Sequence, residues 1–302
     1  MDHLLSIKDL SQQQLLDLLA LAKNIKANPA DYRQALDGKS VVMLFEKPSL
    51  RTRVSFDIGI NKLGGHCLYL DQQNGALGKR EPVSDFAANI SCWADAIVAR
   101  TFLHSTIEQL AEHGSVPVIN ALSDLYHPCQ GLADFLTLSE QYDDVSKVKL
   151  AYVGDGNNVT HSLMFAAAIL GAHLTVLCPP GHFPDGNVVC EAQALAAKHG
   201  GTLVLSSDIA AIADHDAIYT DTWISMGDNA SMEEIEAKFK PYQVNNELMA
   251  AAGAKHFMHC LPAYREVEAT AEIVDGEGSL ILHQAENRMH AQNAVLVTLF
   301  SQ

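Results

Sequence analysis

Short apolar runs alternate with helix-like segments along almost the whole chain, and this alternation restricts the fold more than any other feature. The run from Val41 to Phe45, for example, precedes a helical pattern that closes at Gly64-Gly65. Strands that are separated by helices usually pair in parallel, with helices covering both faces of the sheet. The sequence therefore predicts an α/β fold in which each sheet is mostly parallel.

A polar stretch divides this alternating series into two halves. It runs from Glu140 to Lys147, and no strand or helix pattern continues through it. A chain of 302 residues is long enough for two domains of ordinary size. We therefore expect one α/β domain over residues 1–140 and a second over residues 141–285, followed by a closing helix from about Met289.

The turn after the first strand carries the residue types that bind phosphate. Ser49 is a natural N-cap of the following helix, and the first N–H groups of a helix attract anions. Arg51 and Arg53 add guanidinium groups, which match phosphate geometry. The alternative interpretation is a capped helix with two solvated arginines. Within the phosphate-binding interpretation, Arg53 can also brace the turn instead of contacting the ligand.

Two further segments favour the phosphate-binding interpretation. Arg100 ends a buried strand, and His127–Gln130 follows the next one. Because the carboxyl ends of parallel strands share one edge of the sheet, these side chains and the Ser49 turn are predicted to converge there.

The second half also places polar residues at the ends of its strands, notably Asp221 and Cys260. Gly154-Asp155-Gly156 superficially resembles a dinucleotide-binding turn, but the third glycine of that fingerprint is absent. The pattern therefore argues against nucleotide binding here. The helix after this turn is expected to begin near Ser162.

Composition excludes several classes of protein. The formal net charge is −16, which is unfavourable for nucleic-acid or anionic-membrane partners. The six cysteines form no Cys-x-x-Cys pair, no apolar run reaches 18 residues, and no signal-peptide pattern opens the chain. These features predict a cytoplasmic protein without a membrane partner.

Five segments together resemble the aspartate/ornithine carbamoyltransferase family. They are FEKPSLRTR, HPCQ, DTWISMG, HCLP and AENR, in that order along the chain. The resemblance implies a carbamoyl phosphate domain, an amino-acid domain and an active site in the cleft between them. It also implies that the last segment, 286–302, packs back on the first domain. It further implies homotrimers or multiples of trimers, with a neighbouring subunit's loop reaching the site, and no metal or organic cofactor.

The same resemblance assigns roles to individual residues. The predicted ligands of carbamoyl phosphate are Ser49, Leu50, Arg51, Thr52, Arg100, His127, Gln130, Cys260, Leu261 and Arg288. The predicted ligands of L-ornithine are Asn158, Asp221, Ser225 and Met226. The predicted catalytic residues are Arg100, His127, Asp221 and Cys260.

The implied activity is transfer of the carbamoyl group to the δ-amine of ornithine, giving citrulline and phosphate in arginine metabolism. Two positions depart from the family pattern. Leu50 replaces the usual Thr, and Ala76 stands where the cross-subunit loop often carries a polar side chain. The alternatives are a carbamoyltransferase for N-acylornithine, putrescine or another amine such as aspartate, and a non-catalytic relative.

Overall fold

The chain forms two compact units, which we describe separately. The computed structural model describes residues 1–71, 77–223 and 232–301. Residues 1–133 and 287–302 make up the first unit, and residues 134–286 make up the second. The boundary therefore falls between residues 133 and 134, inside helix α5 (Pro128–Gln141), whereas we expected it at residues 140–141, at the end of the same helix.

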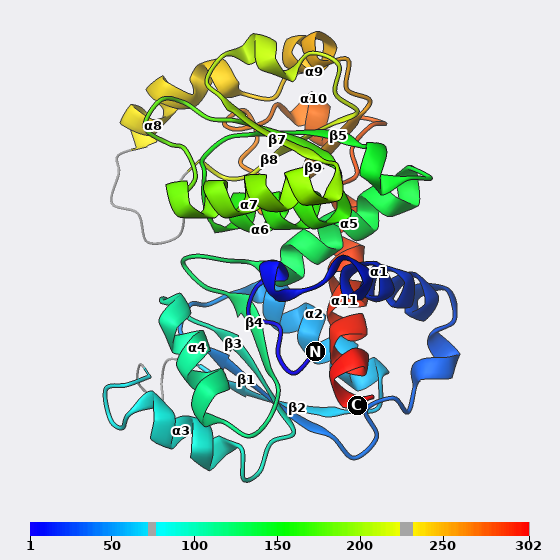
Figure 1. The fold of residues 1–302 in the computed structure, drawn as a ribbon, viewed down its shortest axis with the longest axis vertical. Coiled ribbons are helices and arrows are strands. Elements are labelled where there is room, and N and C mark those ends of the chain that lie inside the picture. Colours follow the sequence, from blue (N-terminus) through cyan, green and yellow to red (C-terminus); the bar gives the residue numbers. More distant parts are fainter. Residues whose placement is uncertain (72–76, 224–231, 302) are drawn as a thin grey trace. The chain divides into compact units, whose positions relative to one another are not determined.

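The first unit contains a four-stranded parallel sheet with the order β2-β1-β3-β4. The chain starts in β1, moves outward to β2, and then returns to the other side of β1 for β3 and β4 (Figure 1). The elements are α1 (Gln12–Ala27), β1 (Ser40–Phe45), α2 (Leu50–Lys62), β2 (His66–Leu70), α3 (Val83–Ile90), β3 (Ala96–Arg100), α4 (His104–His113) and β4 (Val118–Leu122).

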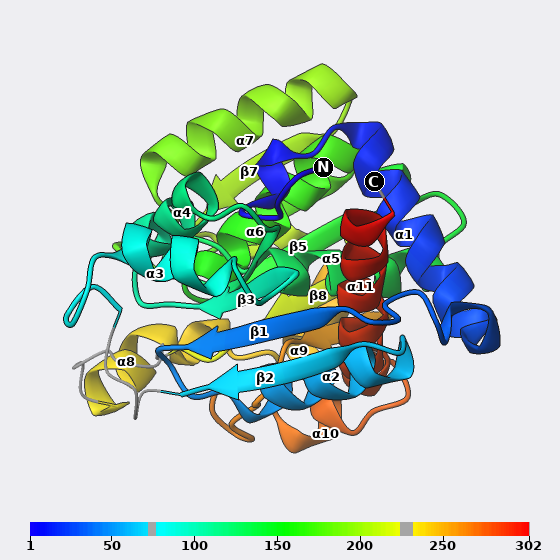
Figure 2. The same cartoon turned by 90° about the horizontal axis from the view of Figure 1, so that it is seen from below.

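Helices cover both faces of this first sheet. Helices α3 and α4 lie on one face and α2 on the other, as Figures 1 and 2 show. Ile97, Ile107 and Leu110 belong to the fully buried core under α3 and α4. On the other face, Gly59 of α2 lies against Asn293 of α11 (Ile281–Phe300), so closely that an added Cβ would lie 2.3 Å from its Oδ1. A side chain at this position would force Asn293 to move.

The second unit contains a five-stranded parallel sheet with the order β7-β6-β5-β8-β9. Here the chain starts in β5, moves outward to β6 and β7, and returns to the other side of β5. The elements are β5 (Lys149–Val153), α6 (Asn158–Leu170), β6 (His173–Leu177), α7 (Gly186–His199), β7 (Thr202–Ser206), β8 (Ala217–Thr220), α8 (Met232–Phe239), α9 (Asn246–Ala252), β9 (His256–His259) and α10 (Ala271–Val274).

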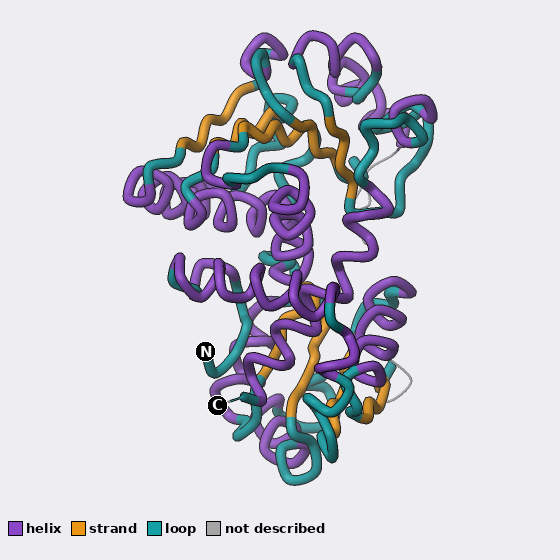
Figure 3. Tube along the Cα trace, turned by 90° about the vertical axis from the view of Figure 1, so that its right-hand side faces the viewer, coloured by secondary structure: helices purple, strands orange, loops and turns teal. Residues whose placement is uncertain are grey.

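The second sheet is also enclosed by helices. Helices α6 and α7 cover one face, while α9 and α10 lie on the other (Figure 1). Ala151, Ile218 and Phe257 of the sheet pack with Leu248 of α9 in one buried cluster. Figure 3 shows the same helix–strand–helix layering in each unit. The predicted α/β class with parallel sheets is confirmed.

The sequence predicted the first residue of some helices correctly and that of others incorrectly. Ser49 caps α2 as expected, and Ser11 and Gln14 form a capping box at the start of α1. Helix α6 begins at Asn158 rather than near Ser162, and α11 begins at Ile281 rather than near Met289. No helix in the described part of the chain is long and apolar enough to cross a membrane.

Candidate active site

In the first unit, polar side chains gather where the chain reverses its direction across the sheet. Strand β1 has β2 on one side and β3 on the other, and Phe45 at the end of β1 lies beside Arg100 at the end of β3. The turn that follows β1 leads to Ser49, the N-cap of α2. Ligands of parallel sheets bind outside the carboxyl ends of the strands at such a switch point.

Arg288 of α11 joins several of these side chains. It donates hydrogen bonds to Gln130 Oε1, to Thr52 Oγ1 at 3.1 Å and to His127 Nε2 at 3.2 Å. Ser49 Oγ in turn lies 2.9 Å from Thr52 Oγ1. All of these side chains except Ser49 are buried. We call Thr52, Arg100, His127, Gln130 and Arg288 the cationic cluster.

Arg100 brings a second buried positive charge to this cluster. Burial first, and then the nearby charge of Arg288, lower the pKa of Arg100 to about 10, so Arg100 remains protonated at neutral pH. Its Nε has no hydrogen-bond partner, and no carboxylate forms an ion pair with Arg100, among the described residues. A buried guanidinium with no counter-ion provides a strong attraction for an anion.

His127 contributes a neutral ring rather than a third charge. Burial, followed by the charges of Arg288 and Arg100, lowers the pKa of His127 well below its usual range. Since His127 Nε2 accepts a hydrogen bond from Arg288, the proton of the neutral ring resides on Nδ1. The neutral imidazole therefore has Nε2 as its acceptor and Nδ1–H as its donor.

Three exposed residues at the start of α2, which are Leu50, Arg51 and Arg53, differ in the contacts that their side chains make. Arg53 stacks on Tyr69, with its guanidinium carbon 3.9 Å from the ring centroid, which supports the bracing role considered for it. Arg51 is exposed, and no hydrogen bond or ion pair joins it to the cationic cluster. Leu50 is 76% exposed at the first position of α2.

The second unit places a carboxylate at its own switch point. Strand β5 has β6 on one side and β8 on the other, and Asp221 follows β8 directly. Asp221 is buried, and its two oxygens have different donors. Cys260 Sγ lies 2.9 Å from Oδ1 and Asn157 Nδ2 lies 3.0 Å from Oδ2. We call Asn157, Asp221 and Cys260 the carboxylate cluster.

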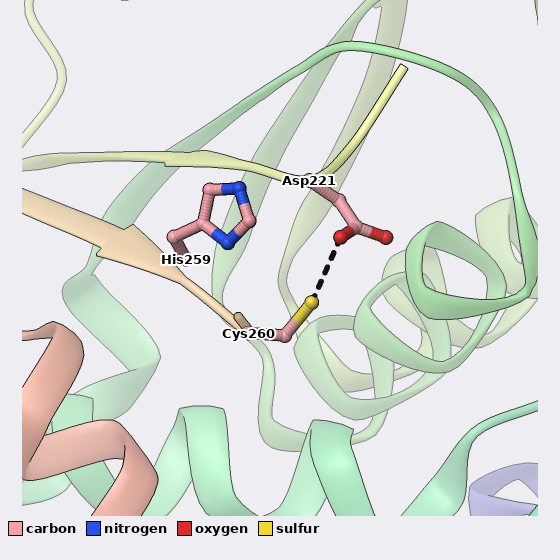
Figure 4. A group of neighbouring side chains, drawn as sticks. All are labelled: Asp221, His259 and Cys260. Atoms are coloured by element: carbon pink, nitrogen blue, oxygen red, sulfur yellow. Dashed lines mark hydrogen bonds between the residues drawn. The ribbon is translucent and has the colours of Figure 1, made fainter. Parts of the chain in front are cut away.

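Cys260 donates a hydrogen bond to Asp221, which Figure 4 draws as a dashed line. Burial first, and then the neighbouring Asp221, raise the pKa of the Cys260 thiol well above its usual range. The group therefore stays protonated at neutral pH. Among the described residues, no Lys, Arg or His side chain forms an ion pair with Asp221.

Asp221, His259 and Cys260 lie close enough together to suggest a metal site, with one ligand atom from each within 4.8 Å of the others (Figure 4). The ring of His259 is already engaged, however. Its Nδ1 accepts the Leu261 N–H at 2.9 Å, so its Nε2 carries the proton and donates to buried Glu268 at 3.1 Å. With both ring nitrogens occupied and the thiol protonated, these residues favour hydrogen bonding over metal ligation.

The other residues predicted to bind a substrate belong to neither cluster, and some of them lie outside the described residues. Asn158 is the first residue of α6 and is partly exposed, and Leu261 follows Cys260 in a turn with a φ of 62°. Ser225 and Met226 lie outside the described residues, as does Ala76. Sequence reasoning missed Asn157, although an Asn directly before a helix was a signal that could have identified it.

Comparison with known proteins agrees with this geometry. The sequence matches the carbamoyl-P binding domain of aspartate/ornithine carbamoyltransferase over residues 2–140. It matches the Asp/Orn binding domain of the same group over residues 146–299. The chain belongs to the aspartate/ornithine carbamoyltransferase family. The carbamoyl-P domain thus coincides with the part of the chain that supplies most of the cationic cluster, while the carboxylate cluster comes from the Asp/Orn domain.

Individual members of the family resemble the whole chain. An ornithine carbamoyltransferase from Shewanella oneidensis is 77% identical over 301 residues, covering 100% of both proteins. The solved ornithine carbamoyltransferase from Pyrococcus furiosus has a TM-score of 0.95 and 44% identity, covering 99% of this chain and 97% of that one. The anabolic enzyme from Campylobacter jejuni has a TM-score of 0.94 and 34% identity, covering 100% of both chains.

Proposed function

We propose that the protein transfers the carbamoyl group of carbamoyl phosphate to the δ-amine of L-ornithine, giving L-citrulline and phosphate. One observation carries this proposal. The first unit holds a buried guanidinium, Arg100, and the second a buried carboxylate, Asp221, and neither has a counter-ion among the described residues. Such charges favour ligands of opposite sign, and the reaction uses one anionic substrate and one that carries an ammonium group. Relatives that match the full chain bear the same activity in their names.

The cationic cluster would act on carbamoyl phosphate. Ser49, Thr52 and the N–H groups at the start of α2, including that of Leu50, suit the phosphate, with Arg51 available from the exposed side. The carbonyl oxygen gains negative charge when the amine attacks, and Thr52, Arg100 and His127 can donate to it. Arg288 and Gln130 hold the cluster together through their hydrogen bond.

The carboxylate cluster would act on ornithine. An alkyl ammonium has a pKa near 10.4, so its neutralisation at pH 7 costs about 4.6 kcal/mol. Asp221 can orient the amine and stabilise the proton that leaves it, while the Cys260 thiol holds the carboxylate in place. The departing phosphate is a strong acceptor for that proton. Asn158, Ser225 and Met226 are proposed to hold the amino-acid end, and Leu261 to line the site beside Cys260.

The proposal also includes the oligomeric state of the protein and the compartment in which it acts. We propose a homotrimer or a multiple of trimers, as the resemblance to the family implies. The exposed apolar residues Leu50, Val54 and Ile58 follow one another along α2 and offer a surface for a subunit contact. We also propose action in the cytoplasm, as part of arginine metabolism. All six cysteines are free thiols, which suits a reducing compartment.

A panel of amines tests the function. Phosphate release and carbamoylated product are measured with carbamoyl phosphate and either ornithine, acetylornithine, putrescine or aspartate. The proposal expects ornithine to have the highest kcat/KM, with citrulline as its product. A higher kcat/KM with acetylornithine or putrescine would replace the substrate assignment, and no turnover with any amine would indicate a non-catalytic relative.

A further inference from the structure

Asn157 has a fixed side-chain orientation in the second unit. Its Oδ1 accepts hydrogen bonds from two backbone N–H groups at the start of α6, those of Val159 at 2.9 Å and Thr160 at 3.2 Å. An amide whose oxygen is held in this way has its NH₂ group free to donate to another acceptor. That group points to Asp221, with Nδ2 3.0 Å from Oδ2. The N-cap of a helix thus sets the direction of a hydrogen bond to the candidate catalytic carboxylate.

The loop before Asn157 holds the residue firmly in place. The Gly156 N–H donates to the His182 carbonyl at 2.8 Å, and an added Cβ at Gly156 would lie 2.2 Å from the backbone nitrogen of Pro184. His182 Nδ1 also lies 3.0 Å from Asp155 Oδ1. The position of Asn157 is therefore determined by backbone packing from a neighbouring loop as well as by α6.

Asp221 receives one donor on each oxygen. The Cys260 thiol occupies Oδ1 and the Asn157 amide occupies Oδ2. An ionised carboxylate can accept about four hydrogen bonds, so two acceptor directions are left for a ligand. Because both donors are neutral, they fix the carboxylate plane without neutralising its charge.

We infer that Asn157 is a positioning residue for amine transfer, which acts by holding the Asp221 carboxylate in the orientation that receives the amine. This inference rests on the proposed function. It assigns a role to Asn157 that the neighbouring Asn158, the predicted amino-acid ligand, does not share. It also separates two tasks of one side chain, the capping of α6 and the orientation of Asp221.

Two substitutions separate these tasks. Asn157→Ser keeps a good helix cap but is too short to reach Asp221, and Asn157→Asp keeps the cap while placing a second carboxylate opposite the first. Asn245 offers a matched control, because it caps α9 of the same unit by accepting the Leu248 N–H at 3.0 Å and makes no contact with Asp221. The controls are Asn245→Ser and Asn245→Asp.

The readouts are kcat/KM for ornithine, binding of carbamoyl phosphate by calorimetry without amine, and the thermal unfolding midpoint. We expect Asn157→Ser to lower kcat/KM about 10- to 100-fold, since a misplacement of about 1 Å at a reacting centre can cost about 100-fold. Carbamoyl phosphate binding and the unfolding midpoint should match those of Asn245→Ser. In Asn157→Asp, repulsion between the carboxylates should move the acid limb of the pH–kcat/KM profile to higher pH.

The inference fails if Asn157→Ser retains kcat/KM within twofold of the wild type, or loses no more than Asn245→Ser does. It also fails if the pH profile of Asn157→Asp overlays that of Asn245→Asp. The activity of the wild type with the panel of amines distinguishes failure of this inference from failure of the proposed function. If it carbamoylates another amine of the panel instead of ornithine, the same comparison is made with that amine. If it carbamoylates none, both the inference and the proposed function are contradicted.

Discussion

In the first unit the chain reverses across its sheet between β1 and β3, and in the second between β5 and β8. The same topology therefore creates the same kind of position twice, at the carboxyl ends of parallel strands. The first unit fills this position with two guanidinium groups and a neutral imidazole. The second fills it with a carboxylate that is held by an amide and a thiol.

The difference shows that topology selects where a ligand binds and that side chains select its charge. In the first unit Gln130 accepts a hydrogen bond from Arg288, and in the second unit Asn157 donates one to Asp221. Neutral partners fix geometry without cancelling the charge, so both positions remain available for a charged ligand. Four predictions test this contrast, in order of decreasing effect.

The largest effect is expected from Arg100→Met, which removes the unpaired charge of the first unit. Loss of one donor to a developing oxyanion lowers kcat about 10²- to 10³-fold. The unfolding midpoint should not fall, because the substitution removes a buried cation that has no carboxylate partner in the described part of the chain. Citrulline formation and thermal unfolding measure the two effects. A stable protein with unchanged kcat would show that Arg100 does not act on the substrate.

Asp221→Asn makes the corresponding change in the second unit. It should lower kcat/KM for ornithine about 100-fold, because an ammonium loses a buried charged partner worth about 3 kcal/mol. Carbamoyl phosphate binding, measured by calorimetry without ornithine, should stay within about twofold, since only the second unit has changed. A large loss of carbamoyl phosphate affinity would contradict the division of labour between the units.

Arg51→Ala and Arg53→Ala test the exposed edge of the cationic region. Arg51 is exposed at the start of α2 and Arg53 stacks on Tyr69. We expect Arg51→Ala to keep the fold and lose about 10- to 100-fold in kcat/KM for carbamoyl phosphate, as one charge-assisted phosphate contact is worth about 1.5–3 kcal/mol. Arg53→Ala should affect stability rather than turnover. Equal losses of kcat/KM in both variants would contradict the assignment of Arg51 as a phosphate ligand and Arg53 as a bracing residue.

The smallest effect is the pH dependence that His127 imposes on stability. Its folded-state pKa lies well below its ordinary value of 6.5, so the unfolded chain binds more protons below about pH 6.5. The contribution of His127 to stability is thus complete above pH 6.5 and is lost as pH falls toward the folded-state pKa.

His127→Gln should therefore flatten the acid side of the stability curve. The slope between pH 6.5 and pH 5 should decrease by at most about 1.4 kcal/mol per pH unit, measured by urea unfolding. The control is His113→Gln at an exposed histidine on α4. A wild-type slope in His127→Gln would show that the ring does not resist protonation in the folded state.

Much of the fold was predictable because its signals are local. The alternation of apolar runs and helical patterns predicted parallel sheets, and Ser11 and Ser49 marked helix starts through hydrogen bonds to residues three positions away. The order of strand ends also predicted which segments meet, because parallel strands share an edge. Arg100 and the residues around His127 could be placed at one edge on that basis alone.

Only the tertiary structure decided which side chains touch. Arg288 reaches Thr52 across 236 positions of sequence, and no local pattern specifies such a contact. The choice of Asn157 over Asn158 as the partner of Asp221 depends on where α6 begins, because Asn157 is the N-cap and Asn158 the first helical residue. The sequence alone determined the parallel arrangement of the strands and the residue types at their ends, while the strand order came from the structure. Burial and long-range packing decided which of those residues kept an unpaired charge.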